Sequence, residues 1–406
     1  MMRRLQIGLV ALVLVIAAFS TGAPFLFFLL YLAILITGGA YVMTRFGLAD
    51  LEAGYVLDRH QAEVGEMLRV TYAVRNASRL PKPWLLAHNP STLPVPLPGR
   101  ALVLGPRSER SWVARVPLTR RGHFRIEQLV VRTGDPFGFF ESTAGVGEPQ
   151  AVTVYPQVEA LPGWRLPPAM LEGAQANPER TAQSTPHVTT IRQYAPGDAY
   201  NRIHWRSSAR HAELQVKEFD LEQTADVWIF LDLQRWAHAG EGDESTIEYA
   251  VRAAAAMSAR SLLEGRALGM HAIGRNAAVL PVDRGGRQYQ KVMQLLAAVQ
   301  PDGSTPLYEV LVRGLPRLRR GMTAVILTPS LATDWIQPLT KLRVRGVGTL
   351  IVLPDAAAFA QHEAREKGLP SLEPSEREAR EREVRALIHA LAEHDLRAAQ
   401  LKPGLP

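Results

Sequence analysis

The chain has 406 residues, more than one domain usually holds, and 47% of them are hydrophobic, which excludes a largely disordered protein. It contains no cysteine, which excludes disulfides, thiolate metal sites and a cysteine nucleophile. The formal net charge is +7. The basic residues are spread along the chain without interleaved aromatic residues, so nucleic acid is not expected as a partner.

Two apolar runs open the chain. Residues 5–19 are hydrophobic apart from Gln6 and Gly8, and residues 25–43 contain no charged side chain. Gly22 and Pro24 predict a turn between them. A helix needs about 20 apolar residues to cross a bilayer, with a lower limit near 17. The second run meets this length and the first is marginal. We predict a transmembrane helical hairpin over residues 1–46, with residues 5–43 in the lipid bilayer.

The charges that flank the two runs predict the orientation of this hairpin. Arg3 and Arg4 precede the first run, Arg45 follows the second, and the turn between them has no charge. Basic flanks remain on the cytoplasmic side of a membrane. We therefore expect a two-helix protein of the inner (cytoplasmic) membrane with cytoplasmic soluble domains. The short first run also resembles a cleaved signal peptide, and that alternative leaves the soluble part cytoplasmic as well.

Residues 47–160 have the pattern of a β-sandwich domain, which we expect to be immunoglobulin-like. Between Met67 and Asn76, apolar residues alternate with polar or small ones, which predicts a strand with one buried face. Residues 111–117 and 124–132 alternate similarly, and proline-rich segments separate the runs. Gly134–Gly138 predicts a turn, because Asp135 can accept backbone hydrogen bonds and Gly138 tolerates positive φ. A binding loop is the alternative there.

The most informative part of the chain is the segment that connects two domains, residues 161–224. Ala195–Asp198 predicts a turn, and the Asp198 carboxylate is expected to cap a short helix that starts near Tyr200. Ile203 and Trp205 are expected to be buried. Four arginines crowd the same segment: Arg192, Arg202, Arg206 and Arg210.

This segment resembles bacterial membrane proteins of the domain-of-unknown-function 58 family. The matching residues are Arg192, Tyr194, Pro196, Gly197, Asp198, Arg202, Ile203, His204, Trp205, Ala209, Arg210 and Lys217–Phe219. Residues 120–122 and 135–138 match the family's upstream pattern, and the hairpin matches its usual architecture. The resemblance implies a von Willebrand factor A-like domain and association with a MoxR-type AAA+ ATPase. It implies no enzymatic activity.

The motif residues leave two interpretations open. His204 is expected to be structural, because no Ser or second His lies at nucleophile or ligand spacing, but a general base remains the alternative. Asp198 and Arg210 form an internal ion pair, or the arginines form an exposed surface for an acidic partner. The candidate partner surface comprises Arg192, Tyr194, Gly197, Asp198, Arg202, His204, Trp205 and Arg210.

Residues 225–356 alternate between strands and helices, which predicts a doubly wound α/β domain of the von Willebrand factor A-like kind. Buried strands are predicted at 227–231, 268–273, 323–327 and 348–353, with helices at 246–264 and 288–299. Asp232 follows the first strand, where such domains bind a divalent metal through an Asp-x-Ser-x-Ser run. Here Gln234 and Trp236 replace the two serines. One carboxylate is too little for Mg²⁺, so no metal or other cofactor is expected.

No phosphate-binding loop is present in the sequence, so ATP binding by this chain is not expected. Residues 357–406 are rich in Glu and Arg and predict a charged helical tail that is solvated, with a partner-binding helix as the alternative. We therefore expect a membrane-anchored, non-catalytic adaptor. The alternatives are a hydrolase that uses His204 with Asp198 or Asp232, and a metal-dependent adhesion domain. No small-molecule substrate is indicated.

Overall fold

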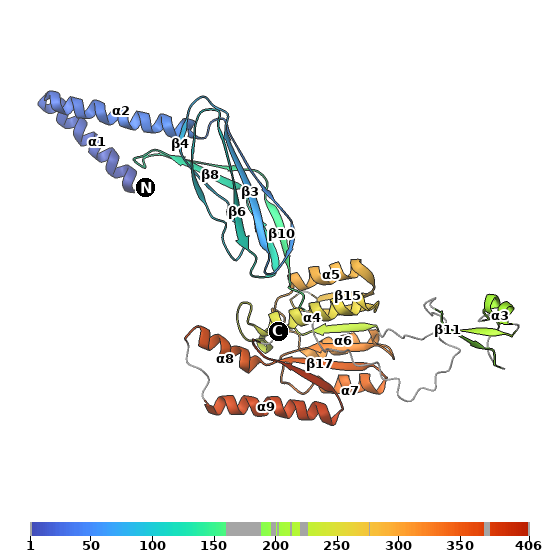
Figure 1. Cartoon of the computed structure of the whole chain (residues 1–406). Helices are drawn as coiled ribbons and strands as arrows, with labels where there is room; N and C mark the ends of the chain where they lie inside the picture. The colour runs from blue at the N-terminus through green and yellow to red at the C-terminus, as the bar shows by residue number, and fades with distance from the viewer. Residues whose placement is uncertain are drawn as a thin grey trace. The chain divides into compact units, whose positions relative to one another are not determined.

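The computed structural model describes residues 2–159, 188–195, 200, 203–211, 213–219, 226–275, 277–368 and 374–404. The chain divides near residue 157 into two compact units. The first holds the N-terminal hairpin and a β-rich region, and the second holds a mixed α/β sheet (Figure 1).

The N-terminal hairpin consists of α1 (Met2–Thr21) and α2 (Pro24–Gly47). Gly22 has a positive φ of 66° and Pro24 occupies the first turn of α2, which explains the sharp break between the helices. Among the described residues, α2 is long and apolar enough to cross a membrane, whereas the apolar stretch of α1, Ala11–Thr21, is shorter. One candidate membrane helix therefore lies near the N-terminus.

The β-rich region has one hydrophobic core between three small sheets, with strand orders β1-β3-β6, β2-β10-β7 and β5-β4-β8-β9. Its strands are β1 (Leu51–Leu57), β2 (Gln61–Glu63), β3 (Met67–Asn76), β4 (Lys82–His88), β5 (Arg100–Leu104), β6 (Glu109–Pro117), β7 (Gly122–Ile126), β8 (Leu129–Gly134), β9 (Glu141–Val146) and β10 (Gln150–Tyr155).

Strand β3 confirms the alternation in the sequence, because Leu68, Val70, Tyr72 and Val74 are buried and the residues between them are exposed. The single strand expected over residues 124–132 is wrong. The chain leaves one sheet after β7 and joins another at β8, and the Glu127 carbonyl between them accepts a hydrogen bond from the Asn89 amide at 2.7 Å. The buried positions shift by one residue at this crossing, from Ile126 to Leu129 and Val131, so a single alternating strand does not fit the segment.

The second unit contains a six-stranded sheet of order β15-β14-β13-β16-β17-β18, in which the edge strand β15 is antiparallel and the others are parallel. Its strands are β13 (Val227–Leu231), β14 (Leu268–Ile273), β15 (Ala277–Asp283), β16 (Thr323–Leu327), β17 (Gly348–Pro354) and β18 (Arg397–Leu401). Its helices are α4 (Thr246–Leu263), α5 (Gly285–Ala298), α6 (Leu307–Gly314), α7 (Ile336–Val344), α8 (Ala356–Glu366) and α9 (Pro374–Glu393).

The C-terminal residues differ from the expected solvated tail. Leu387 and Leu391 of α9 are buried in the same core cluster as strands β16 and β17, and so is Leu396. Strand β18 then pairs with β17 and extends the sheet. The narrow apolar stripe of α9 is therefore a core-facing stripe, which a mostly charged helix needs if it is to cover one edge of a sheet.

Candidate functional site

Asp232 lies where the sheet of the second unit changes direction. Counted from β13, the strands run 3-2-1-4-5-6 across the sheet, so β13 and β16 are neighbours from which the chain winds in opposite directions. Ligands of open α/β sheets bind beyond the carboxyl ends of the strands at such a switch point. Asp232 directly follows β13, and Thr328 directly follows β16. The sheet thus brings these two side chains together.

Both oxygens of the Asp232 carboxylate accept hydrogen bonds from the protein. The Thr328 hydroxyl donates to Oδ2 at 2.6 Å, and the backbone N–H of Gln234 donates to Oδ1 at 2.9 Å. The residue is 0% exposed. Burial raises the pKa of Asp232, although these two hydrogen bonds favour the anion. A metal ion at this carboxylate would have to displace Thr328 or share an oxygen with it.

His238 packs behind Asp232 and has both ring nitrogens engaged. Nε2 donates to the Asp232 carbonyl at 2.9 Å, which leaves Nδ1 as the acceptor in the neutral ring, 3.0 Å from the Thr246 hydroxyl. Burial lowers the pKa of His238, which favours this neutral form. His238 and Thr246 join the Asp232 loop to the start of α4. Neither residue was singled out in the sequence, because their contact depends on how the loop between them folds.

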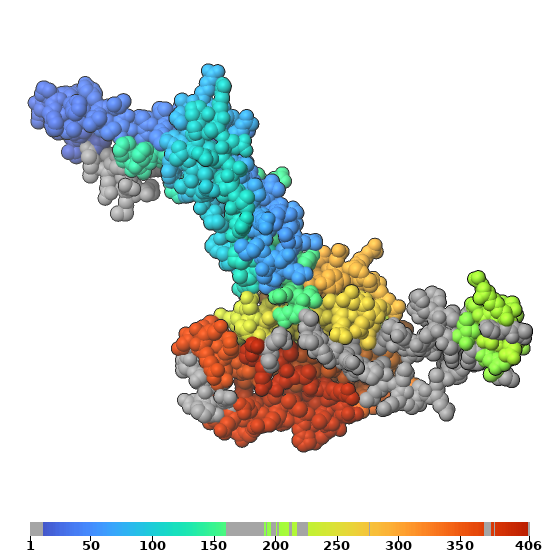
Figure 2. All heavy atoms as spheres, in the orientation of Figure 1, coloured from blue at the N-terminus to red at the C-terminus, as the bar shows by residue number. Residues whose placement is uncertain are grey.

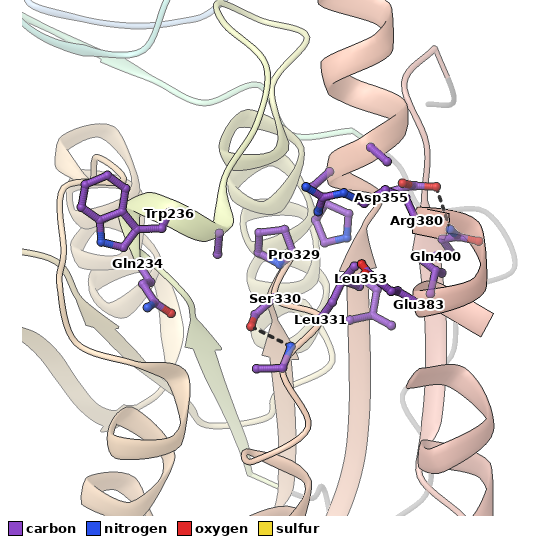
Figure 3. Close-up of a pocket in the computed structure, with 16 residues that line it drawn as sticks. Gln234, Trp236, Pro329, Ser330, Leu331, Leu353, Asp355, Arg380, Glu383 and Gln400 are labelled. Atoms are coloured by element: carbon purple, nitrogen blue, oxygen red, sulfur yellow. Dashed lines mark hydrogen bonds between the residues drawn. The ribbon is translucent and has the colours of Figure 1, made fainter. Parts of the chain in front are cut away.

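A pocket of about 290 Å³ lies in front of this edge of the sheet (Figure 3). Figure 3 shows Gln234 and Trp236 on one side of it and Arg380 and Glu383 of α9 on the other. Gln234 and Trp236 contribute an amide and an indole to the lining of this pocket. In the part of the chain that the structure describes, no three His, Asp or Glu side chains gather in a way that could hold a metal ion.

The family motif contains a two-stranded sheet, in which β11 (Val188–Gln193) pairs with β12 (Gln215–Phe219), and α3 (Trp205–His211) lies between the two strands in sequence (Figure 1). We call these three elements the motif unit. The Ser207 N–H donates to His204 Nδ1 at 3.2 Å, and the Ser207 hydroxyl lies 2.8 Å from the same nitrogen. His204 therefore caps the first turn of α3, as a Ser or Asp side chain commonly does. Among the described residues, no hydrogen bond joins His204 to a carboxylate, which a general base usually needs for orientation.

The expectation that Trp205 is buried is wrong, whereas the expectation for Ile203 is confirmed. Trp205 is 66% exposed, and Ile203 is buried and bridges to Val216 of β12. Arg206 and Arg210 are exposed on the same helix as Trp205. Helix α3 has only seven residues, and about two turns are too short a pattern to separate a buried face from an exposed face.

The remaining predicted motif residues are described in part. Tyr194 stacks on Tyr200, with ring centroids 6.2 Å apart, and the backbone of Arg192 belongs to β11. Gly197, Asp198 and Arg202 lie outside the described residues, and so do the predicted Asp198 cap and the predicted ion pair of Asp198 with Arg210. The structure thus assembles His204, Trp205 and Arg210 in one motif unit and places Asp232 at the switch point of the sheet.

Comparisons with known sequences and with solved structures found similar proteins. The chain is 24% identical over 309 residues to the uncharacterized protein YeaD of Bacillus subtilis, which covers 73% of this chain and 75% of that protein. Similar solved structures include the CARDB domain of the PF1109 protein from Pyrococcus furiosus (16% identity, TM-score 0.20, 26% of this chain and 92% of that one). Another is trypsin-activated alpha-2-macroglobulin from Escherichia coli (20% identity, TM-score 0.21, 27% of this chain and 8% of that one).

Both TM-scores are too low to define the fold. The family match is direct, because residues 190–391, which contain the motif and most of the α/β sheet, match the family described as protein of unknown function DUF58. The chain belongs to the DUF58 family.

Proposed function

We propose that this chain is a membrane-anchored, non-catalytic adaptor that presents its motif unit to a partner protein. The observation that carries the proposal is the exposure of Trp205 beside Arg206 and Arg210 on α3. Tryptophan and arginine are the residues that most often dominate the binding energy of protein interfaces. An indole that is 66% exposed contributes little to the fold, so its presence in the motif favours a role in binding.

The partner we propose is a MoxR-type AAA+ ATPase that acts with the chain in cell-envelope or protein-maturation processes. The support comes from the family resemblance and from the adaptor-like surface of the motif. An arginine-bearing helix suits an acidic docking surface, since guanidinium groups form bidentate hydrogen bonds with carboxylates.

The hydrolase alternative has less support. The Asp232 carboxylate is fully buried and accepts hydrogen bonds from Thr328 and Gln234, so it has no free oxygen that faces solvent. His204 uses Nδ1 to cap α3 and its hydrogen bonds remain within the motif unit. Asp232 would have to become accessible to a substrate before it could take part in catalysis.

The metal-dependent adhesion alternative rests on a von Willebrand factor A-like fold, which we propose for the α/β unit. The strand order with one antiparallel edge strand supports that assignment, and Asp232 at the switch point is the position of the metal in such domains. Gln234 and Trp236 in place of hydroxyls support a degenerate site. For the β-rich region we propose an immunoglobulin-like sandwich, supported by its alternating strands around one core.

Anchoring in the cytoplasmic membrane is the last part of the proposal. Helix α2 provides the span, α1 is proposed as the second span of a hairpin, and the flanking Arg3, Arg4 and Arg45 favour cytoplasmic soluble domains.

Co-purification from native membranes tests the proposed function. Full-length wild type should retain an AAA+ ATPase, and both Trp205→Ala and Arg210→Ala should lose most of it without a change in melting temperature, because exposed substitutions alter stability by no more than about 0.5 kcal/mol. Trp236→Ala is the matched control, since Trp236 is 78% exposed but lies at the pocket rim of the sheet.

Two results would count against the motif as the docking surface. One is loss of the ATPase in Trp236→Ala alone, which would move the partner surface to the sheet edge. The other is equal destabilisation by Trp205→Ala and Arg210→Ala, which would make the motif a structural joint.

A further inference from the structure

The turn between β8 and β9 carries a cluster of aromatic side chains in the first unit. Phe137 and Phe139 stack with ring centroids 5.5 Å apart, and Phe137 is 49% exposed. Trp84 on the neighbouring strand β4 is 40% exposed. Three phenylalanines within four residues of a turn have no role in the core of the β-rich region, so this cluster needs another explanation.

The turn itself is rigid. The Asp135 carboxylate accepts hydrogen bonds from the N–H groups of Phe137 at 2.8 Å and Phe140 at 2.6 Å, and Gly138 has a positive φ of 71°. Burial opposes ionisation of Asp135, but the backbone hydrogen bonds outweigh it and lower its pKa, so the carboxylate is held as an anion beneath the loop. The outer surface of the turn therefore presents aromatic rings rather than charge.

This turn is fixed against the last turns of the membrane helix α2. The Phe140 ring packs edge-on against Tyr41 of α2 at 5.6 Å. At the end of the helix, Gly47 has no room for a side chain, because a Cβ there would lie 2.6 Å from a Thr133 methyl group. Figures 1 and 2 show the end of the β8–β9 hairpin alongside the C-terminal half of α2.

A buried lysine completes the joint. Lys82 of β4 is buried, and its ammonium donates to the Phe46 carbonyl at 2.5 Å. Burial lowers the pKa of Lys82, while the nearby Asp50 opposes that shift. A cation at the C-terminal carbonyls of a helix is favoured by the helix dipole. These contacts fix the position of the aromatic turn along the axis of α2.

The length of α2 shows how deep in a bilayer this position would lie. A helix rises about 1.5 Å per residue, so Tyr41 lies roughly 26 Å along the axis from Pro24. The hydrocarbon core of a bilayer is about 30 Å thick. When α2 spans the membrane from Pro24, Tyr41 and the Phe140 ring against it lie close to the opposite boundary between hydrocarbon and headgroups. Aromatic side chains are enriched at that boundary.

We propose that the Asp135–Phe140 turn inserts Phe137 and Phe139 into the interface of the lipid bilayer, as a second membrane contact beside α2. This inference rests on the proposed span of α2. It assigns the aromatic turn to lipid, and it makes the β-rich region a domain that lies against the membrane surface rather than one that swings freely from its anchor.

Depth-dependent quenching in the full chain tests the inference. The sequence contains no cysteine, so a single introduced cysteine takes a single environment-sensitive fluorophore. The label is placed at Phe137→Cys, at Pro136→Cys, which keeps Phe137, at Leu35→Cys within α2, and at Val103→Cys on the exposed face of β5. Each protein is reconstituted into phosphatidylcholine and phosphatidylglycerol vesicles that carry nitroxide lipids with shallow or deep labels.

The labels at 136 and 137 should shift to the blue and be quenched most by the shallow nitroxide, the label at 35 by the deep nitroxide, and the label at 103 by neither. The inference would be overturned if the labels at positions 136 and 137 were no more quenched than the label at position 103 while the label at position 35 was quenched. That result would leave the span of α2 intact and would point to a protein partner for the turn. Absence of quenching at 35 would show that the span itself fails, and the inference with it.

Discussion

At the scale of single residues, the main feature of the switch point of the sheet is a buried carboxylate that accepts hydrogen bonds from the protein. Asp232 lies at the switch point of the sheet, and the Thr328 hydroxyl and the backbone N–H of Gln234 each donate a hydrogen bond to one of its carboxylate oxygens. A hard cation such as Mg²⁺ requires about six oxygens in near-octahedral array. The residues around Asp232 offer hydrogen-bond donors instead, which is the environment of a structural carboxylate.

The first prediction concerns metal at this position. The melting temperature of the full-length protein should be the same in Mg²⁺, in Mn²⁺ and in a chelator. A ligand present at about 100 times its dissociation constant would add about 2.7 kcal/mol to the free energy of unfolding, which a thermal melt detects. The matched variant is Asp232→Asn, which removes the charge at similar size. Stabilisation by Mg²⁺ in the wild type that disappears in this variant would contradict the assignment of a degenerate site.

His271 supplies a second prediction at this scale, on the pH dependence of stability. It is buried on β14 against Phe230, and burial, with Arg317 and Arg313 nearby, lowers its pKa to about 4. The unfolded chain binds a proton at His271 below pH ~6.5 and the folded chain does so only below pH ~4. The stabilisation from the neutral ring is therefore present above pH ~6.5 and is lost as the pH falls towards 4, with a total of roughly 3 kcal/mol.

Urea unfolding at a series of pH values measures this loss. The variant His271→Leu should show a flatter dependence between those pH values than the wild type. His389→Gln serves as the control, because the side chain of His389 is 77% exposed and its replacement should leave the curve unchanged. Parallel curves for wild type and His271→Leu would show that His271 does not titrate in this range.

At the scale of elements, α9 illustrates how a charged helix becomes part of a core. Most of its side chains are charged or small, yet Leu387 and Leu391 point into the cluster formed with β16 and β17. Ile388, next to Leu387, is 38% exposed. A single line of leucines is enough for a helix that covers only the edge of a sheet.

The third prediction separates a core helix from a solvated tail. Leu391→Ala should lower the free energy of unfolding by about 2–5 kcal/mol, because it empties a fully buried site. Ile388→Ala on the same helix should cost much less, since part of its side chain is already in water. Chemical denaturation of both variants checks this. If both variants lowered the free energy of unfolding by the same small amount, α9 would be a solvated tail rather than a core helix.

The elements that the sequence predicts well are those with a strong pattern. Alternation identified β3, and short, largely apolar runs identified β13, β14, β16 and β17. The edge strand β18 lacks such a run, because an edge strand has one exposed side and need not be apolar. The apolar run of the edge strand β15 contains Pro281, and a proline argues against a strand in the interior of a sheet. Strand β18 takes its place by pairing with β17, a contact between distant parts of the sequence that a local pattern does not encode. Strand β15 pairs with β14, the strand directly before it, through a short hairpin.

The candidate site shows the same limit. Asp232 is predictable, because a carboxylate directly after a buried strand falls at the ligand edge of a parallel sheet. Thr328 follows its own strand in the same way, and that signal could have identified it. His238 and Thr246 could not be found, because their contact depends on the fold of the loop between them. Trp205 was misplaced because an apolar residue in a short helix is buried or exposed according to its neighbours in space.

At the scale of the whole molecule, the anchor determines which partners the soluble part can reach. An ATPase that hydrolyses cytoplasmic ATP can act on this chain only when the motif unit is on the cytoplasmic side. Helix α2 is the candidate span among the described residues and the described apolar stretch of α1 is shorter, so the orientation is predicted from the flanking charges alone. Topology is therefore the property on which the proposed partnership depends most directly.

The last prediction tests that orientation with a reporter enzyme that is active only outside the cytoplasm. Fused after Pro406 it should be inactive, and fused after Gly22, in the turn between the apolar runs, it should be active, because the flanking Arg3, Arg4 and Arg45 predict that both ends of a hairpin lie inside. The Gly22 fusion is the control that the reporter is exported when the first run inserts. Activity at Pro406 would place the motif outside the cytoplasm. The partner of Trp205 would then have to be an extracytoplasmic protein, and a cytoplasmic ATPase would be excluded whatever the sequence resemblance implies.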